Sequence, residues 1–338
     1  ECAEDWICFL LSVSGYDRKL SGSQSRQGAT MPQSTNHRTS STSQSPDGPT
    51  TFSRRQVLAG SAALLLGERI VQSQASLSKT VVFAHTTVVG VDAVQDDVAL
   101  AVDGDKIVAI GPTEQVLETY PNADVYDGRG KALLPGLINC HAHMAAVLAR
   151  GFNEDFGFPN SAQLAIRPNS LLEGEEAALM VTVAALEAIK TGTTTIVENT
   201  GNISPNAAAL AQTGLRCVFA ESVRDSENVA GPMSPGGLAN SAPPTFSAKR
   251  RDEGLQRISD LFSTWHGKEQ GRITVFPAAA LAETSSPELL RAIRAFADKH
   301  DLGYTIHLSQ SVPEVEFMVR HHGLRPPAFL DQHGFLGP

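Results

Sequence analysis

Basic residues, cysteines and long apolar runs are scarce in this chain of 338 residues. Lysine and arginine number 27 against 36 aspartates and glutamates, so the formal net charge is −9 at pH 7. Because nucleic-acid binding requires a concentrated basic surface, we expect no nucleic-acid partner. Four cysteines are too few for a disulfide scaffold. The apolar stretch at residues 57–66 is too short to cross a bilayer, so we expect no membrane span.

Apolar side chains, at 41% of residues, are sufficient to build one large domain or two smaller ones. Cys140 and Cys217 both lie in apolar segments that have the composition of strands. We therefore expect both to be buried free thiols. Nothing in the composition decides between a monomer and a homo-oligomer.

The first 78 residues differ in composition from the rest of the chain. The chain begins with glutamate, so Met31 is a candidate for the natural start and residues 1–30 are an unassigned leader. Residues 31–78 begin with a stretch rich in serine, threonine and proline that lacks the apolar material for a core, so we expect disorder there. Arg54 and Arg55 then precede the short apolar stretch, and the pair resembles a twin-arginine export signal. On this interpretation we expect export to the periplasm, and a cytoplasmic protein if the stretch is instead an N-terminal amphipathic helix.

Residues 79–135 are expected to form a small β-rich unit. The stretches "KTVVFAHTTVVGVD" and "DDVALAVDGDKIVAIG" are rich in β-branched residues, which is typical of strands. Asp103 and Gly104 lie between two such runs and predict a hairpin turn. A further strand and a glycine turn follow, and then an apolar run that ends at His141 and His143.

From residue 136 onward, helical patterns alternate with apolar strands. One helix is predicted to end at Gly192, with Leu179, Val183 and Leu186 on its inward face. Because about five strands alternate with helices, we expect a parallel sheet with right-handed crossovers. Most of these strands are continuous apolar runs, which is typical of a sheet covered on both faces.

Two further features of this region bear on its local structure. Ser286 is placed to cap a later helix, and Pro287 is favourable at its first position. The long segment from Ser226 to Ala248 is rich in proline, glycine and serine, and we interpret it as either a mobile flap over a site or a disordered insertion.

Three histidines at strand ends are the candidate metal ligands. His141 and His143 are two residues apart, so in an extended chain both imidazoles point to the same side. His307 ends another apolar strand, and the carboxyl ends of parallel strands in a barrel converge on one mouth. One zinc ion could then bind all three, although a chance pair on a surface turn would also explain His141 and His143.

The stretch "GKALLPGLINCHAHM" resembles the metal-binding opening of the amidohydrolase superfamily. The resemblance is closer to the branch of aminohydrolases and chlorohydrolases, which includes cytosine and guanine deaminases, deaminases of adenosine derivatives and triazine hydrolases. The supporting stretches are "DGDKIVAIGP", "YDGRGKALLPGLINCHAHM", "EAIKTGTTTIVEN" and "YTIHLSQS". Together they extend over about residues 80–338.

The resemblance implies a fold, a metal and a chemistry. The fold class would be α/β, with residues 136–338 as part of a TIM (β/α)8 barrel and residues 79–135 as half of a composite β-sandwich. His141 and His143 would be metal ligands from the first strand, and His307 a ligand from the fifth. The cofactor would be a divalent metal, zinc or alternatively iron, that activates water to attack a small-molecule substrate.

The chain also departs from the family pattern at several points. Five strands cannot close an eight-stranded barrel, so we expect a fragment of a longer protein or a naturally truncated chain. Gln310 occupies the position where the deaminases usually have a glutamate that transfers protons. Its amide could orient the substrate or the reacting water, or it could simply line the mouth. Ala280 lies where the deaminases often have a histidine, and Glu283 is the nearest candidate to substitute for it.

Two functional hypotheses follow from these residues. The first is a metal-dependent hydrolase of a non-peptide C–N bond, in a cyclic amide or amidine, that uses a metal-activated water. The alternative is a truncated or degenerate homologue that binds metal without catalysis. The first is supported by the three strand-end histidines, and the second by Gln310, Ala280 and the missing strands.

Overall fold

A computed structural model of the chain describes residues 8–12, 80–151, 172, 174–231 and 237–337. The chain forms two compact units, which divide between Leu134 and Pro135 and are described separately below. Met31 and the Arg54–Arg55 pair lie outside the described residues, so the export signal stays a prediction. Within the described part of the chain, none of the helices has the length and apolar character needed to cross a membrane.

The N-terminal unit is a six-stranded sheet, which confirms its expected β-rich character. Its strands are β1 (Cys8–Ser12), β2 (Val81–Val89), β3 (Val94–Asp103), β4 (Lys106–Pro112), β5 (Asp124–Asp127) and β6 (Lys131–Pro135). The order is β1-β6-β2-β3-β4, and β5 also pairs with β2. Asp103 pairs with Lys106 across the predicted hairpin turn, where Gly104 has a φ of 61°. Helix α2 (Thr113–Thr119) was not predicted, and its Val116 packs on the buried face of β2 and β3.

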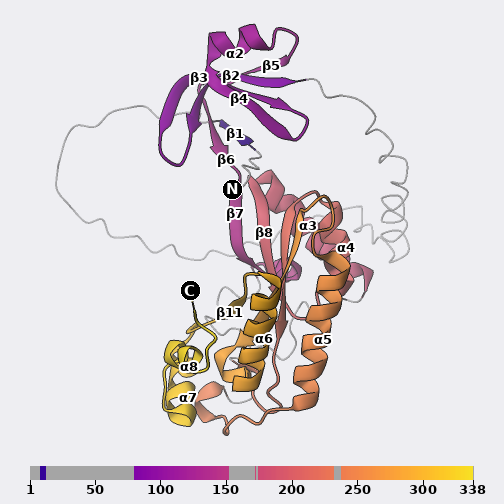
Figure 1. Ribbon diagram of the computed structural model, residues 1–338, viewed down its shortest axis with the longest axis vertical. Helices are drawn as coiled ribbons and strands as arrows, with labels where there is room; N and C mark the ends of the chain where they lie inside the picture. The colour runs from indigo at the N-terminus through magenta and orange to yellow at the C-terminus, as the bar shows by residue number, and fades with distance from the viewer. Residues whose placement is uncertain (1–7, 13–79, 152–171, 173, 232–236, 338) are drawn as a thin grey trace, which may run out of the picture. The chain divides into compact units, whose positions relative to one another are not determined.

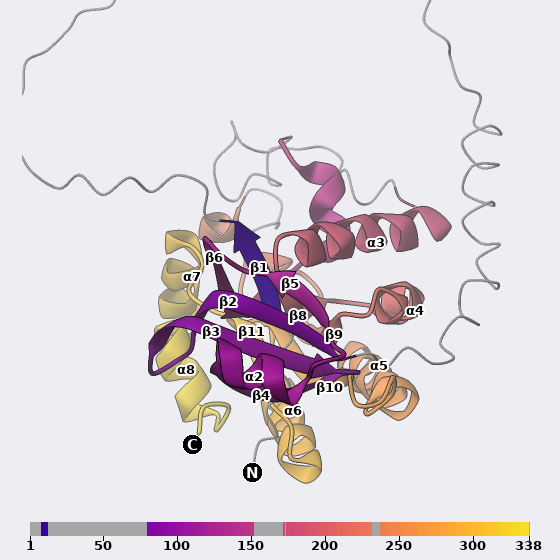
Figure 2. The same ribbon diagram turned by 90° about the horizontal axis from the view of Figure 1, so that it is seen from above.

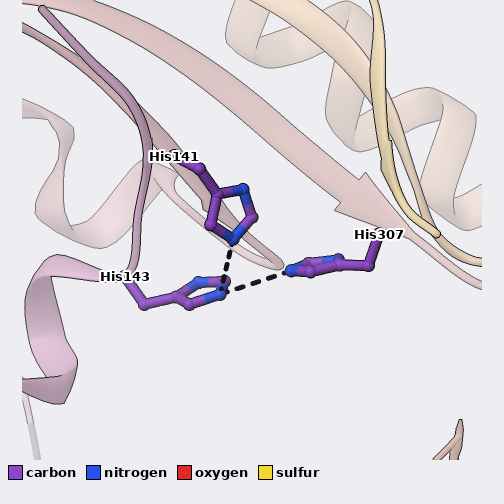
Figure 3. Close-up of side chains that lie close together, drawn as sticks. All are labelled: His141, His143 and His307. Atoms are coloured by element: carbon purple, nitrogen blue, oxygen red, sulfur yellow. Dashed lines mark hydrogen bonds between the residues drawn. The ribbon is translucent and has the colours of Figure 1, made fainter. Parts of the chain in front are cut away.

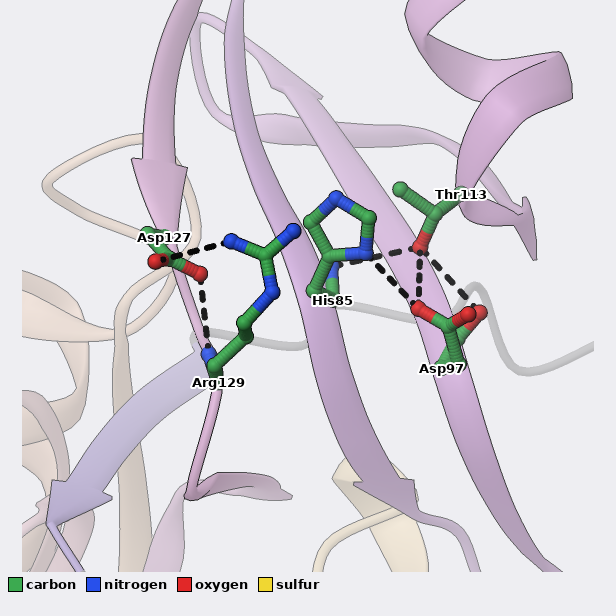
Figure 4. Close-up of polar contacts among 5 residues, drawn as sticks. All are labelled: His85, Asp97, Thr113, Asp127 and Arg129. Atoms are coloured by element: carbon green, nitrogen blue, oxygen red, sulfur yellow. Dashed lines mark hydrogen bonds and ion pairs between the residues drawn. The ribbon is translucent and has the colours of Figure 1, made fainter.

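Strands β2 and β3 each contain a left-handed residue where their pairing is irregular (Figure 4). His85 has a φ of 55° and Asp97 a φ of 51°, and the His85 ring nitrogen Nδ1 lies 2.8 Å from Asp97 Oδ1. The Thr113 hydroxyl accepts from the His85 N–H and donates to the Asp97 carbonyl. The hydrogen bond with His85 lowers the pKa of the Asp97 carboxyl. A second turn in this unit is closed by Arg129, whose N–H and guanidinium both donate to Asp127.

The second unit is built on a five-stranded parallel sheet of order β11-β10-β9-β8-β7. The strands are β7 (Leu137–Ala142), β8 (Thr193–Thr200), β9 (Arg216–Val223), β10 (Ile273–Leu281) and β11 (Thr305–His307). The helices are α3 (Glu175–Lys190), α4 (Ser204–Gln212), α5 (Ala248–Trp265), α6 (Pro287–His300), α7 (Val312–His322) and α8 (Pro326–Gln332). Figures 1 and 2 show α3, α4, α5 and α6 following one another along one face of the sheet. Consecutive strands are neighbours, which confirms the predicted partial barrel.

Alternation along the strands fixes which face meets the helices. In β9, Cys217 and Phe219 are buried in one apolar cluster with α3 and α4 residues such as Val181 and Leu210. A second cluster joins Val223 at the end of β9 to residues of α5, α6, α7 and α8. The predicted cap is present, because the Ser286 hydroxyl accepts from the Leu289 N–H at the start of α6.

Two expectations about burial were wrong. Leu179 and Leu186 of α3 are 46% and 49% exposed, whereas Val181 and Ala185 are buried. The helix therefore packs through its smaller side chains, which allow a closer approach to the sheet than leucine would. Cys217 is a buried free thiol as expected, but Cys140 is exposed, as are all residues of β7 except Ala142.

The segment between β9 and α5 is ordered where the structure describes it. Ser226 forms a bridge with Phe246, and the Asn228 side chain bonds to the backbone of Pro243 and Thr245. Residues 232–236 lie outside the described residues.

Helix α5 approaches β9 closely at Gly254, so we expect any side chain at this position to lower the stability of the fold. A Cβ atom there would collide with Val223 Cγ1 and lie 3.2 Å from Val223 Cβ. Alanine favours a helix by up to about 1 kcal/mol over glycine, but overpacking costs about 1–3 kcal/mol. We expect Gly254→Ala to lower the free energy of unfolding in urea by roughly 1 kcal/mol. In the Val223→Ala background the same change should cost less, because the colliding methyl group is gone, and the difference is the coupling energy between the two positions.

The control for this prediction is Ser263→Ala on the exposed side of α5, which should change stability by less than about 0.5 kcal/mol. A Gly254→Ala chain as stable as the unmodified chain would contradict the close approach of helix and strand.

Candidate metal centre

The three predicted histidines meet at one rim of the second unit (Figure 3). His141 lies in β7, His143 directly follows it, and His307 ends β11. The Nε2 atom of His143 lies 3.1 Å from that of His141 and 3.3 Å from that of His307. One ring nitrogen from each residue falls within 4.8 Å of the others.

Curvature of the sheet brings these residues together. Strands β7 and β11 are the two ends of the strand order, separated by three strands. In a flat sheet, strands four steps apart would be roughly 19 Å from each other. Imidazole nitrogens from both ends nevertheless lie 3.3 Å apart, so the sheet must curl as the wall of a barrel does.

The sequence before the histidines sets the start of β7. A Cβ atom at Gly136 would collide with the side chain of Thr194, so only glycine fits between β6 and β7. After the strand begins, the Asn139 side chain accepts from the His141 N–H at 3.1 Å. The close approach at Gly136 and the local Asn139 bond thus fix the backbone before the first histidine.

The imidazole rings of His307 and His143 each bond to a backbone group through one nitrogen, which leaves the other nitrogen facing the candidate metal position. Nδ1 of His307 lies 2.8 Å from the carbonyl oxygen of Ala280, an acceptor, so in the neutral ring Nδ1 carries the proton. The lone pair of His307 then lies on Nε2, which faces His143. His143 is hydrogen-bonded to the backbone of Asn199. A backbone acceptor behind a histidine that fixes its tautomer is typical of metal-binding imidazoles.

The surroundings favour neutral imidazoles. Desolvation lowers the pKa of both His141 and His143, although both residues remain exposed at the rim, and the neighbouring histidines lower it further. The bond between His143 and the Asn199 backbone acts in the opposite direction. Metal ligation requires the unprotonated ring, so these shifts make nitrogen lone pairs available at neutral pH. Converging neutral imidazoles fit a borderline cation such as zinc.

Several buried polar residues near the strand ends were not predicted from the sequence. Glu198 is 2% exposed, and burial raises the pKa of its carboxyl to about 7. The hydrogen bond that it accepts from the Met144 N–H lowers this pKa in part. Asn199 is fully buried, and its side-chain amide has no hydrogen-bond partner among the described residues. The signal that could have identified both was a glutamate and an asparagine at the end of the predicted strand "TTTIVEN".

The positions that depart from the family pattern lie on the same rim. Gln310 follows His307 by three residues and is partly buried, and its substrate-binding role stays a prediction. Ala280 lines a cavity of about 530 Å³ together with Arg224, Arg250 and Arg257. Ala280 lines this cavity, and its carbonyl oxygen is also the partner of His307 Nδ1.

Glu283 is not one of the converging ligand residues, and its substitution for the family's histidine stays a prediction. Its side chain is fully buried, and neither carboxylate oxygen has a hydrogen-bond partner among the described residues. It is not part of the group of side chains whose ligand atoms meet at the three histidines. Burial, followed by the neighbouring Glu314, raises the pKa of Glu283 to about 8.

Comparison with known proteins identifies the family. The model of the amidohydrolase family matches residues 132–337, which is more than half of the chain. The chain belongs to the amidohydrolase family. A shorter match, to an imidazolonepropionase-like composite domain from bacteria, spans residues 99–123. The expected membership of the aminohydrolase branch is confirmed, because the similar curated proteins are named as deaminases.

Two of these amidohydrolase relatives act on adenosine derivatives, according to their names. The 5'-deoxyadenosine deaminase of Methanobrevibacter smithii is 31% identical over 242 residues, 71% of this chain and 50% of the relative. The 5-methylthioadenosine/S-adenosylhomocysteine deaminase of Carboxydothermus hydrogenoformans is 29% identical over 76% of this chain and 55% of the relative. The chain thus spans about half the length of the curated relatives it matches.

A solved structure supports the fold. An adenosine deaminase from Xanthomonas campestris with bound zinc superposes with a TM-score of 0.62 and 25% identity. The match covers 76% of this chain and 55% of the solved one.

Stability is expected to depend on pH through Glu283. Its folded pKa of about 8 exceeds the ordinary value of 4.5, so the folded state keeps a proton that the unfolded state releases. The free energy of unfolding should therefore fall as pH rises from about 4.5 to about 8, by roughly 4 kcal/mol at most. Urea unfolding with a chelator present, at pH 6 and pH 8.5, measures this slope.

Glu283→Gln, which stays neutral, should flatten this pH dependence. The matched control is Glu316→Gln on the exposed side of α7, which should leave the slope unchanged. Equal slopes for Glu283→Gln and the unmodified chain would show that Glu283 is not a buried acid.

Proposed function

We propose that the chain carries the metal centre of a hydrolase that cleaves a non-peptide C–N bond in a heterocycle. The observation that carries this proposal is the convergence of three imidazole nitrogens, from both ends of a curled parallel sheet, within 4.8 Å of one another. Membership of the amidohydrolase family agrees with that chemistry.

The names of the relatives suggest a substrate class. A 5'-deoxyadenosine deaminase and a methylthioadenosine deaminase both remove an amino group from an adenine ring. The carbon that bears this group is part of a cyclic amidine, the kind of bond expected from the sequence. We therefore propose an adenosine derivative altered at its 5' position as substrate, with water consumed and ammonia released.

His141, His143 and His307 would hold the metal. When bound there, a divalent cation, zinc or alternatively iron, supplies Lewis-acid activation of water. The chain's own contribution is orientation: the Ala280 carbonyl holds the His307 ring with Nε2 toward the centre. Desolvation also lowers the pKa of His141 and His143, which favours the neutral rings. We propose that the Gln310 amide donates to or accepts from the heterocycle, although it cannot take up a proton at neutral pH.

A homologue that binds metal without catalysis is the second candidate. Two positions favour it, because Gln310 cannot transfer a proton and Ala280 has no polar side chain. Both candidates share the metal centre and differ only in turnover.

Metal analysis tests the shared part of the proposal. We expect the full chain to bind one zinc ion, and His141→Ala with His307→Ala to bind none, because a single remaining imidazole cannot hold it. His333→Ala, at the end of α8, is the matched control and should keep the metal. Folding of each variant is checked by circular dichroism.

Unchanged zinc content in the double variant would refute the metal centre. Ammonia release from 5'-deoxyadenosine and methylthioadenosine then separates the two candidates. Release by the zinc-loaded chain that the double variant lacks supports the hydrolase, and zinc binding without release supports the inactive homologue.

A further inference from the structure

Buried carboxylates hold the loops at the rim of the second unit. Each accepts backbone N–H groups from the loop that follows a strand, and each is at most 2% exposed. The residues concerned are Glu198, Glu221, Asp225 and Glu314. Because loop N–H groups at strand ends have no partner strand, a buried acceptor is needed to satisfy them.

Glu198 holds the loop that follows the first two histidines. It lies on β8 opposite Ala142, and its Oε2 accepts from the Met144 N–H at 2.8 Å. Met144 directly follows His143 in the chain. The hydrogen bond thus fixes the backbone at the peptide next to one candidate ligand.

Glu314 holds the loop that follows the third histidine. Its Oε1 accepts from the Ser309 N–H and its Oε2 from the Gln310 N–H, both at 2.7 Å. Ser309 has a φ of 54°, a left-handed conformation that a serine rarely adopts without support. The two charge-assisted bonds stabilise this turn two residues after His307.

Glu221 forms an equivalent pair of bonds where no histidine is present. Its two oxygens accept from the Asn202 and Ile203 N–H groups at 2.8 and 2.9 Å, and Arg257 also donates to it. The loop it holds follows β8, which carries none of the three histidines. Glu221 is therefore a natural comparison for Glu314.

We propose that Glu198 and Glu314 are positioning residues that set the geometry of the three imidazoles through the backbone on both sides of the centre. This inference rests on the proposed metal site. Neither carboxylate belongs to the group of ligand atoms that meet there, so both act through the loops and not as ligands. Metal sites require ligands placed within about 0.5 Å, a precision that the supporting hydrogen bonds supply.

Cobalt(II) binding to the full chain tests this proposal, because its affinity and visible spectrum report ligand geometry without turnover. Glu314→Gln keeps the size of the side chain but can accept only one of the two N–H bonds, so we expect roughly tenfold weaker binding and a changed spectrum. Glu198→Ala removes the acceptor of the Met144 N–H and should also weaken cobalt binding, whereas Glu198→Gln keeps a side-chain oxygen and should weaken it less. Cobalt affinity in Glu198→Ala equal to that of the unmodified chain would contradict the role of Glu198.

Glu221→Gln is the matched control, since it loses one of two equivalent bonds at a loop without a histidine. It should lower stability in urea while leaving cobalt affinity and spectrum unchanged. Equal affinity of Glu314→Gln and the unmodified chain would overturn the proposal, as would an equal loss in Glu221→Gln. If the unmodified chain binds no cobalt, the proposed metal site itself is wrong, which is a separate and recognisable result.

Hydrogen exchange decides the question if Glu314→Gln does not fold. In the unmodified chain, cobalt should slow exchange of the Met144, Ser309 and Gln310 amides by at least about tenfold, because binding and loop closure are coupled. Unchanged exchange at these amides would overturn the proposal.

Discussion

Curvature of one parallel sheet is the constraint on which the candidate site depends. Only a curled sheet brings His143 and His307, from its opposite ends, to 3.3 Å. Helices pack along one face of this curled sheet (Figure 2), and α5 approaches β9 closely where Gly254 meets Val223. Metal binding and barrel packing are therefore not independent, because any change that flattens the sheet separates the imidazoles.

Buried acids are the second recurring feature of this rim. Glu198, Glu221 and Glu314 have backbone partners, so hydrogen bonds reduce the cost of burying each carboxyl. Glu283 and Asn199 have no such partners among the described residues, and their burial costs stability. Buried polar groups with and without backbone partners both lie near strand ends. Burying them lowers the stability of the fold but fixes the arrangement of the side chains there.

Much of this arrangement could be predicted from the sequence, for identifiable reasons. Apolar strands alternating with helices indicated the parallel sheet, and the cap formed by Ser286 followed from local chemistry alone. The spacing of His141 and His143 and the strand-end position of His307 indicated a shared site, since barrel strands end at one mouth. Burial was harder: the inward face of α3 and the exposure of Cys140 depend on which elements pack nearby. The roles of Glu198 and Glu314 were missed because their partners are backbone groups, which no side-chain pattern reveals.

The central claim is that three imidazoles from two distant strands bind one cation. X-ray absorption at the zinc edge of the zinc-loaded chain tests it most directly, because this method counts and identifies the ligand atoms. We expect three imidazole nitrogens at about 2.0–2.1 Å, with any remaining positions filled by oxygen. A sulfur neighbour at about 2.3 Å, as Cys140 beside His141 would give, or fewer than three imidazoles, would show that the three histidines do not form the site.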